Sequence, residues 1–164
     1  MKKFFLSILI LLASIQICQA FPEYLDGDRN YPAIDGHMGT GYFMDKNSIY
    51  VEMEVPPVYV LQVSCLCVAD PDVSKVSDAT ILKFRIRYVD EKTPQMYMEG
   101  LNDEWVYVKP FGSYAESGVI LPIGEAAFYT KFDRKFYGRE PMYNDFFKEN
   151  SEVFGEKFYE KLRG

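Results

Sequence analysis

Residues 82–108 read LKFRIRYVDEKTPQMYMEGLNDEWVYV, and apolar and polar side chains alternate through three short segments of this stretch. Alternation with a period of two indicates a β-strand that buries one face. The first segment has the clearest pattern, with apolar and basic residues in alternate positions: Leu82, Phe84, Ile86 and Tyr88 against Lys83, Arg85 and Arg87. Short connections at residues 90–94 and 100–103 separate the segments. Because short connections join antiparallel neighbours, we predict a β-meander.

Two further strands are predicted before this stretch. The first is half-buried, because apolar residues occupy every second position: Ile49, Val51, Met53 and Val55. The second covers residues 58–68 and is apolar on both faces, as a central strand should be. Pro56 and Pro57 break the chain between the two. The sheet is therefore expected within residues 40–109, with about five strands.

A helical period replaces the strand period after residue 110. An apolar stripe recurs every four residues: Phe128, Phe132 and Phe136. Pro122 suits a first helical turn, Glu125 lies near the positive end of the helix, and Gly138 supplies a stop. Basic residues crowd the far end: Lys131, Arg134 and Lys135. We predict a helix over residues 122–137, with Phe132 as its most deeply buried residue.

A second aromatic stripe follows this helix. Its members have helical spacing: Tyr143, Phe147, Phe154, Phe158 and Leu162. We predict a helix over about residues 142–163, which Asn150 and Ser151 could divide into two pieces. The predicted fold class is α+β. It consists of an antiparallel β-meander sheet packed by one or two C-terminal helices, in a single domain over residues 21–164.

The first residues have the pattern of a secretory signal peptide. Lys2 and Lys3 precede an apolar run over residues 4–17, and small residues stand at the −3 and −1 positions of a cut after Ala20. The run is shorter than the roughly 20 residues that span a bilayer, although an uncleaved anchor is the alternative. The pattern predicts a bacterial protein, secreted or periplasmic, with no membrane span once residues 1–20 are removed.

The charge balance argues against nucleic acid as a partner. The full chain has a formal net charge of −6, and loss of the two lysines of the leader makes the remainder more acidic. Binding to a phosphate backbone requires a clustered basic face, which this acidic chain does not suggest.

The chain's single histidine lies in the octet IDGHMGTG, residues 34–41. The glycine spacing fits neither a dinucleotide loop nor a P-loop, and one histidine excludes a His-Glu-x-x-His zinc site. We expect a turn that leads into the sheet, with His37 structural or in contact with a ligand. The alternative is a hydrolase that uses His37 as base and Asp35 as orienter.

Two other segments have residues that bind metals in some proteins. Asp26, Asp28 and Asn30 begin like a calcium loop, but the later ligands do not follow, so a solvated turn is preferred to a looser cation site. Cys65 and Cys67 point to one face of a strand. Buried free thiols are preferred there over a strained or intermolecular disulfide or a metal half-site. We expect neither a cofactor nor a metal.

Two groups of side chains on the predicted sheet are candidates for ligand contact. Arg85 and Arg87 could form an anion-binding stripe, but pairing with glutamates of neighbouring strands is the preferred interpretation: Glu52, Glu54 or Glu99. Trp105, Tyr107 and Tyr97 could bind a sugar or peptide, although a core position under the helices is preferred. The ligand-binding candidates are therefore His37, Asp35, Arg85, Arg87 and Trp105.

The absence of a recognisable catalytic motif favours a binding role. We predict a small exported binding or interaction protein of the cell envelope or the extracellular space. Its partner would be an envelope protein, a peptide or a glycan. The alternatives are the secreted hydrolase described above and a structural subunit that forms a homo-oligomer.

Overall fold

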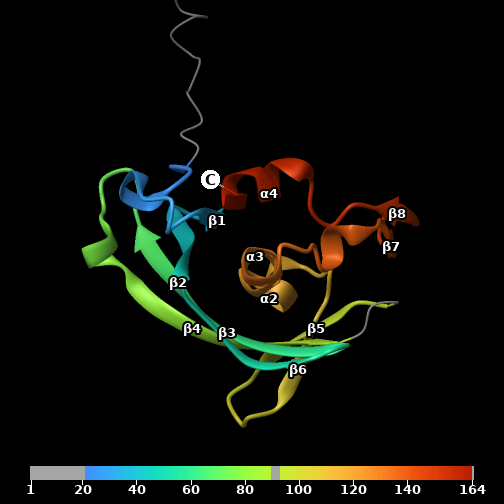
Figure 1. Ribbon diagram of the computed structural model, residues 1–164. Coiled ribbons are helices and arrows are strands. Elements are labelled where there is room, and N and C mark those ends of the chain that lie inside the picture. Colours follow the sequence, from blue (N-terminus) through green and yellow to red (C-terminus); the bar gives the residue numbers. More distant parts are fainter. Residues whose placement is uncertain (1–20, 90–92, 164) are drawn as a thin grey trace, which may run out of the picture.

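A strongly curled antiparallel sheet is the main element of the structure (Figure 1). The structure is a computed structural model that describes residues 21–89 and 93–163. The predicted signal peptide, residues 1–20, lies outside the described residues. Six strands follow one another across the sheet in chain order: β1 (Ala33–His37), β2 (Thr40–Val55), β3 (Val58–Ala69), β4 (Thr80–Val89), β5 (Gln95–Glu99) and β6 (Trp105–Val108). The predicted meander is confirmed.

Within this sheet, β1 is the strand that lies outside the predicted range of residues 40–109. It includes the first half of the octet IDGHMGTG. β1 pairs with β2 antiparallel, and His37 stands opposite Thr40. Met38 and Gly39 connect the strands with positive φ values of 49° and 79°. Positive φ at both central residues is the geometry of a tight hairpin turn, which matches the twist of the flanking strands. The octet is therefore a β-hairpin rather than a turn before the first strand.

A β-bulge in β2 changes which side chains of that strand face the core. Ile49 and Val51 pack against the core as predicted, whereas Met53 and Val55 are exposed. The pairing register with β3 shifts between Val51 and Met53. An extra residue in one strand moves the following side chains to the opposite face, so strict alternation fails beyond the bulge.

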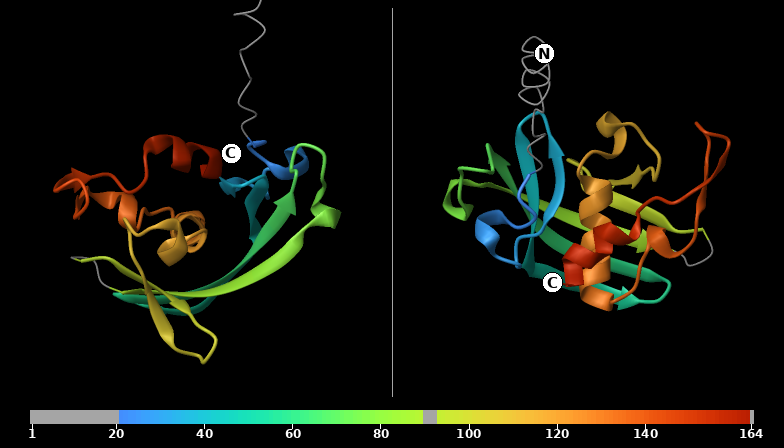
Figure 2. Two further views of the ribbon diagram at one scale, coloured as in Figure 1. Left: turned by 180° about the vertical axis from the view of Figure 1, so that it is seen from behind. Right: turned by 90° about the horizontal axis from the view of Figure 1, so that it is seen from above.

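Three helices cover the concave face of the sheet: α2 (Tyr114–Ser117), α3 (Ile120–Phe132) and α4 (Glu156–Arg163). Figure 2 shows α3 crossing the strands within the concavity. The core between them is formed by buried side chains of the sheet and α3, among them Tyr88, Met96, Ile123 and Phe128. No helix in residues 21–89 and 93–163 is long and apolar enough to cross a membrane.

The first predicted helix ends earlier than residue 137. It terminates at Phe132, and Asp133 follows in the left-handed conformation with a φ of 50°. The chain then turns back, so Phe136 lies outside the helix and packs against Phe128, with ring centroids 5.1 Å apart. Phe128 and Phe136 are buried while Phe132 is only partly buried. The prediction that Phe132 is deepest is therefore wrong.

The second predicted helix is correct only over its last eight residues. Residues 142–151 contain a small hairpin instead, formed by β7 (Met142–Asn144) and β8 (Glu149–Ser151). The Asn144 side chain accepts hydrogen bonds from the backbone N–H groups of Phe146 and Phe147, which favours a turn over a helix. The spacing of four between Tyr143 and Phe147 is thus compatible with a hairpin.

A buried carboxylate connects the helices. Glu125 lies beyond the first turn of α3 and is buried in the core. There it accepts hydrogen bonds from four groups: Phe136 N–H at 2.8 Å, Tyr137 N–H at 2.7 Å, Gly138 N–H at 3.5 Å and the Tyr159 hydroxyl at 2.8 Å. Burial raises the pKa of Glu125, and these donors oppose the shift. Glu125 therefore holds the chain after α3, together with α4, against the core.

Candidate functional site

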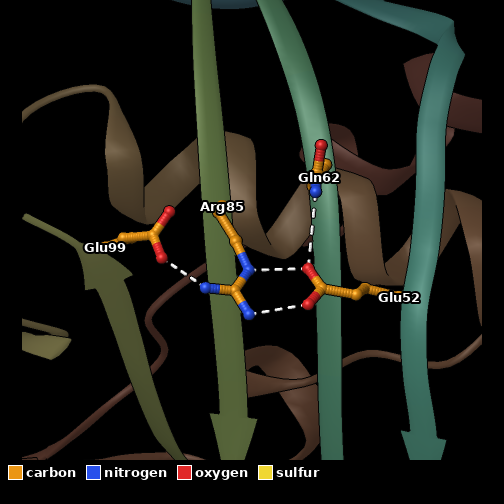
Figure 3. A network of polar contacts seen from close by, with 4 residues as sticks. All are labelled: Glu52, Gln62, Arg85 and Glu99. Carbon is orange, nitrogen blue, oxygen red and sulfur yellow. Dashed lines mark hydrogen bonds and ion pairs between the residues drawn. The ribbon is translucent and has the colours of Figure 1, made fainter. Parts of the chain in front are cut away.

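The convex face of the sheet carries a polar network around Arg85. The Nε and Nη2 atoms of Arg85 donate to the two carboxylate oxygens of Glu52 at 2.6 and 2.7 Å, and Nη1 donates to Glu99 (Figure 3). Gln62 donates to Glu52 at 3.4 Å. The two carboxylates raise the pKa of Arg85, and Arg85 lowers the pKa of Glu52. The predicted pairing across the sheet is confirmed for Arg85, whose guanidinium is already bound on both sides.

Trp105 lies on this convex face and not beneath the helices, and Tyr107 follows it along the edge strand β6, where it also borders a pocket beside α2. Pairing places Trp105 opposite Glu99 and Tyr107 opposite Tyr97, so these side chains share the face of Arg85. The Arg85 guanidinium lies 5.0 Å from the centroid of the Trp105 ring. Tyr107 is 42 % exposed. The prediction of a core position is wrong for this pair, because strand register decides which face each residue occupies.

Asp35 and His37 lie at the opposite end of the sheet, in and beside the β1–β2 hairpin. The exposed His37 ring stacks on Tyr114 of α2, with centroids 4.2 Å apart. Asp35 accepts a hydrogen bond from the backbone N–H of Gly36 at 2.8 Å. Burial, with a contribution from Tyr42, raises the pKa of Tyr114 to about 12. These contacts attach α2 to the hairpin, which is a structural role for His37.

The five candidates from the sequence thus fall into two separate groups. Arg85, Arg87 and Trp105 belong to the convex face, whereas Asp35 and His37 belong to the β1–β2 end. Within the described residues, no three side chains of the metal-binding types come together. The calcium-like segment uses its carboxylates locally: Asp28 accepts from the backbone N–H of Asn30 at 2.8 Å, and Asp26 from that of Val76 at 3.1 Å.

A row of three adjoining pockets follows the chain from residue 134 to residue 146. The arginine pocket, of about 430 Å³, is bounded by these residues: Pro57, Tyr59, Phe128, Arg134, Lys135, Phe136, Arg139 and Glu140. The central pocket, of about 350 Å³, shares Phe136, Arg139 and Glu140 with it. The hairpin pocket, of about 590 Å³, shares Met142 and Tyr143 with the central one. Because neighbouring pockets share lining residues, the three adjoin one another, and we call them together the 134–146 groove.

The arginine pocket combines an aromatic floor with cationic walls. Its floor is made of buried rings: Tyr59, Phe128 and Phe136. Arg134 donates to the Tyr59 hydroxyl at 3.0 Å, and its guanidinium carbon lies 5.6 Å and 5.7 Å from the centroids of Tyr59 and Phe128. No carboxylate of the described residues forms an ion pair with Arg134 or Arg139.

The far end of the groove is aromatic and lies between β6 and the β7–β8 hairpin. Tyr107, Phe111, Tyr143 and Phe146 line the hairpin pocket, together with the ion pair that Lys109 forms with Glu116 at 2.7 Å. Phe146 is 84 % exposed and Tyr143 is 58 % exposed. Large exposed aromatic side chains beside a concave surface are typical of binding sites.

The sequence pattern did not indicate the groove, because both of its main segments have residues at helical spacing. A local signal was nevertheless present. Residues 134–139 read RKFYGR, in which basic residues flank two aromatic residues. Once the chain leaves α3 at Asp133, that run forms pocket walls instead of a helix end. Comparisons of the chain with protein-family models, curated proteins and solved structures find no match.

Proposed function

We propose that the protein is a small exported binding protein of the cell envelope or the extracellular space, and that the 134–146 groove is its ligand surface. The observation that carries this proposal is the adjacency of the three pockets. The arginine and central pockets share Phe136, Arg139 and Glu140, and the central and hairpin pockets share Met142 and Tyr143. Each pocket falls within the roughly 300–1,000 Å³ that ligand sites occupy. A row of such pockets suits an elongated ligand such as a peptide or a glycan chain.

The side chains of the groove support binding more than catalysis. Glu116 is paired with Lys109, and Lys135 is paired with Glu156. Asp35 and His37, the pair of the alternative hydrolase, line none of the three pockets. A catalytic base must reach the substrate within hydrogen-bond distance. A ligand in this groove would instead meet aromatic rings, two guanidinium groups and the backbone of the hairpin.

The test uses two matched tyrosines. Tyr143 lies where the central and hairpin pockets meet and is 58 % exposed, whereas Tyr50 lies on β2 outside the groove and is 62 % exposed. Protein comprising residues 21–164 serves as the bait. Its ligands are selected from random-sequence peptides displayed on phage and from a glycan array. Tyr143→Arg should weaken binding of the selected ligands at least tenfold, and Tyr50→Arg should leave it unchanged.

Two results would contradict the proposal. One is a set of selected ligands whose affinity is the same for Tyr143→Arg and the unmodified protein. The other is the absence of any ligand above background in both libraries. Circular dichroism on both variants shows whether the fold is intact, which is expected because exposed tyrosines contribute little to the core.

A homo-oligomer is a second candidate, supported by the tip of the β7–β8 hairpin. Phe146 is 84 % exposed and Phe147 is 64 % exposed, and their rings contact each other with centroids 5.0 Å apart. Sedimentation velocity distinguishes this candidate: a dimer that Phe146→Ser converts to monomer would favour it. A monomer over the accessible concentration range would exclude it.

A further inference from the structure

Two guanidinium groups beside an aromatic floor give the arginine pocket a specific chemistry. Arg134 and Arg139 have no carboxylate partner among the described residues, whereas Arg85, Lys109 and Lys135 are all ion-paired. The planar fork of arginine matches a carboxylate with two parallel hydrogen bonds. A guanidinium without an acidic partner at a pocket wall is therefore available to an anionic ligand.

The net charge of the walls sets the charge of that ligand. Lys135 is neutralised by Glu156, and Glu140 contributes one negative charge to the same pocket. Two guanidinium groups and one carboxylate leave a surplus of one positive charge. A monoanion balances this surplus, whereas a phosphate dianion would add like-charge repulsion with Glu140.

The floor of the pocket defines what must be attached to the anion. The rings of Tyr59, Phe128 and Phe136 are buried by the rest of the protein and form the apolar base of the cavity. An apolar group at this base would lie against aromatic rather than polar atoms and would leave little polar surface without a partner. The ligand thus needs an apolar group close to its negative charge.

We propose that the arginine pocket binds the free C-terminal carboxylate of a peptide whose last side chain is apolar. This proposal rests on the 134–146 groove being the ligand surface and assigns the direction of the ligand. The terminal carboxylate lies between Arg134 and Arg139, and the last side chain lies on the aromatic floor. The preceding residues run through the central pocket, which shares Phe136, Arg139 and Glu140, towards Tyr143.

The experiment compares two tripeptides that differ only at the C-terminus with a fatty acid. The probes are N-acetyl-Gly-Gly-Phe with a free carboxylate, the same tripeptide as its C-terminal amide, and octanoate. Each is titrated into isotope-labelled residues 21–164, and the backbone and arginine Nε–H signals are followed by NMR. The free acid should bind at least tenfold more tightly than the amide and shift the Nε–H signals of Arg134 and Arg139.

Matched arginine variants locate the interaction. Arg134→Gln and Arg139→Gln should each weaken binding of the free acid at least fivefold. Arg87→Gln should not change it, because Arg87 pairs with Tyr97 on the convex face of the sheet. Arg139→Gln keeps the test valid if loss of the Arg134 contact with Tyr59 disturbs the fold, since Arg139 is exposed.

The results separate this proposal from the proposed function. Equal affinity of acid and amide, with shifts along residues 134–146, would overturn the carboxylate assignment and leave the groove as the ligand surface. Binding of octanoate without binding of the tripeptide acid would overturn the peptide assignment in favour of an acyl chain. NMR shifts confined to the convex face, or no shifts with any of the probes, would overturn the carboxylate proposal. Either result would also count against the groove as the ligand surface.

Discussion

The Tyr159 hydroxyl of α4 donates a hydrogen bond to the buried Glu125 carboxylate of α3 at 2.8 Å. This contact joins the last helix of the chain to the helix that fills the sheet. Gly138 lies so close to it that a Cβ atom at this position would collide with the Tyr159 hydroxyl. The carboxylate also accepts hydrogen bonds from the backbone N–H groups of residues 136 and 137, and residue 136 lines the groove. The position of the groove therefore depends on a group in the core.

Glu125→Gln should destabilise the protein by about 2 to 4 kcal/mol. The amide nitrogen of glutamine cannot accept a hydrogen bond, so at least one of the donors on Glu125 is left buried and unpaired. Urea denaturation followed by circular dichroism measures the change. Glu160→Gln, an exposed change on α4, is the control and should alter stability by less than about 0.5 kcal/mol. Equal midpoints for the two variants would contradict a stabilising role of Glu125.

Phe128→Ala should cost more stability than Phe132→Ala. Phe128 is buried and contacts the rings of Tyr59, Tyr88, Phe132 and Phe136 at centroid distances of 4.8 to 5.4 Å. Removing such a ring typically costs about 3 to 5 kcal/mol, and the partly buried Phe132 should cost less than about half of that. Chemical denaturation of both variants tests the order. A larger loss for Phe132→Ala would mean that the core lies on the other side of α3.

The two cysteines should differ in reactivity. Cys65 is buried, and burial raises the pKa of its thiol to about 12, whereas Cys67 is partly exposed. Because the thiolate is the reactive form, Ellman's reagent at pH 8 should modify one thiol quickly in native residues 21–164. Cys67→Ser should abolish this fast phase, and Cys65→Ser should preserve it. A fast phase that persists in Cys67→Ser would show that Cys65 is accessible.

Acid should loosen α2 through Glu116. The Lys109 ammonium, together with Ser113, lowers the pKa of Glu116 from 4.5 to about 2. Since the folded-state pKa is below that of the unfolded chain, the stabilising contribution is complete above about pH 4.5 and is lost as the pH falls through about 2. The Ser113 N–H, which donates to Glu116 at 3.0 Å, should exchange faster with solvent across that range. Glu116→Gln should remove this pH dependence, and an unchanged profile in the variant would assign the effect to another group.

Local patterns predicted the strands β2 to β6 and their order in the sheet. Alternating residues in β4 and the short connections after it predict an antiparallel meander, because strand burial and hairpin closure depend on neighbours in the chain. Spacing also indicated a helix in this region, although Phe128 is the one member of the predicted stripe that is buried within α3. The same local logic correctly indicated that Arg85 would find glutamates on adjacent strands, since cross-strand partners follow from antiparallel pairing.

The faces of the sheet and the groove depended on the tertiary structure. The pairing register places Trp105 beside Arg85 on the convex face, and a bulge exposes Met53. A register shift of one residue would move either side chain to the opposite face of the sheet. The left-handed Asp133 ends α3, so Arg134 meets Tyr59, a residue 75 positions away in the chain. A spacing of four between aromatic residues is compatible with a helix or a hairpin, so spacing alone did not distinguish them. Contacts between distant segments leave no periodic signal, which is why the groove appears only in the folded chain.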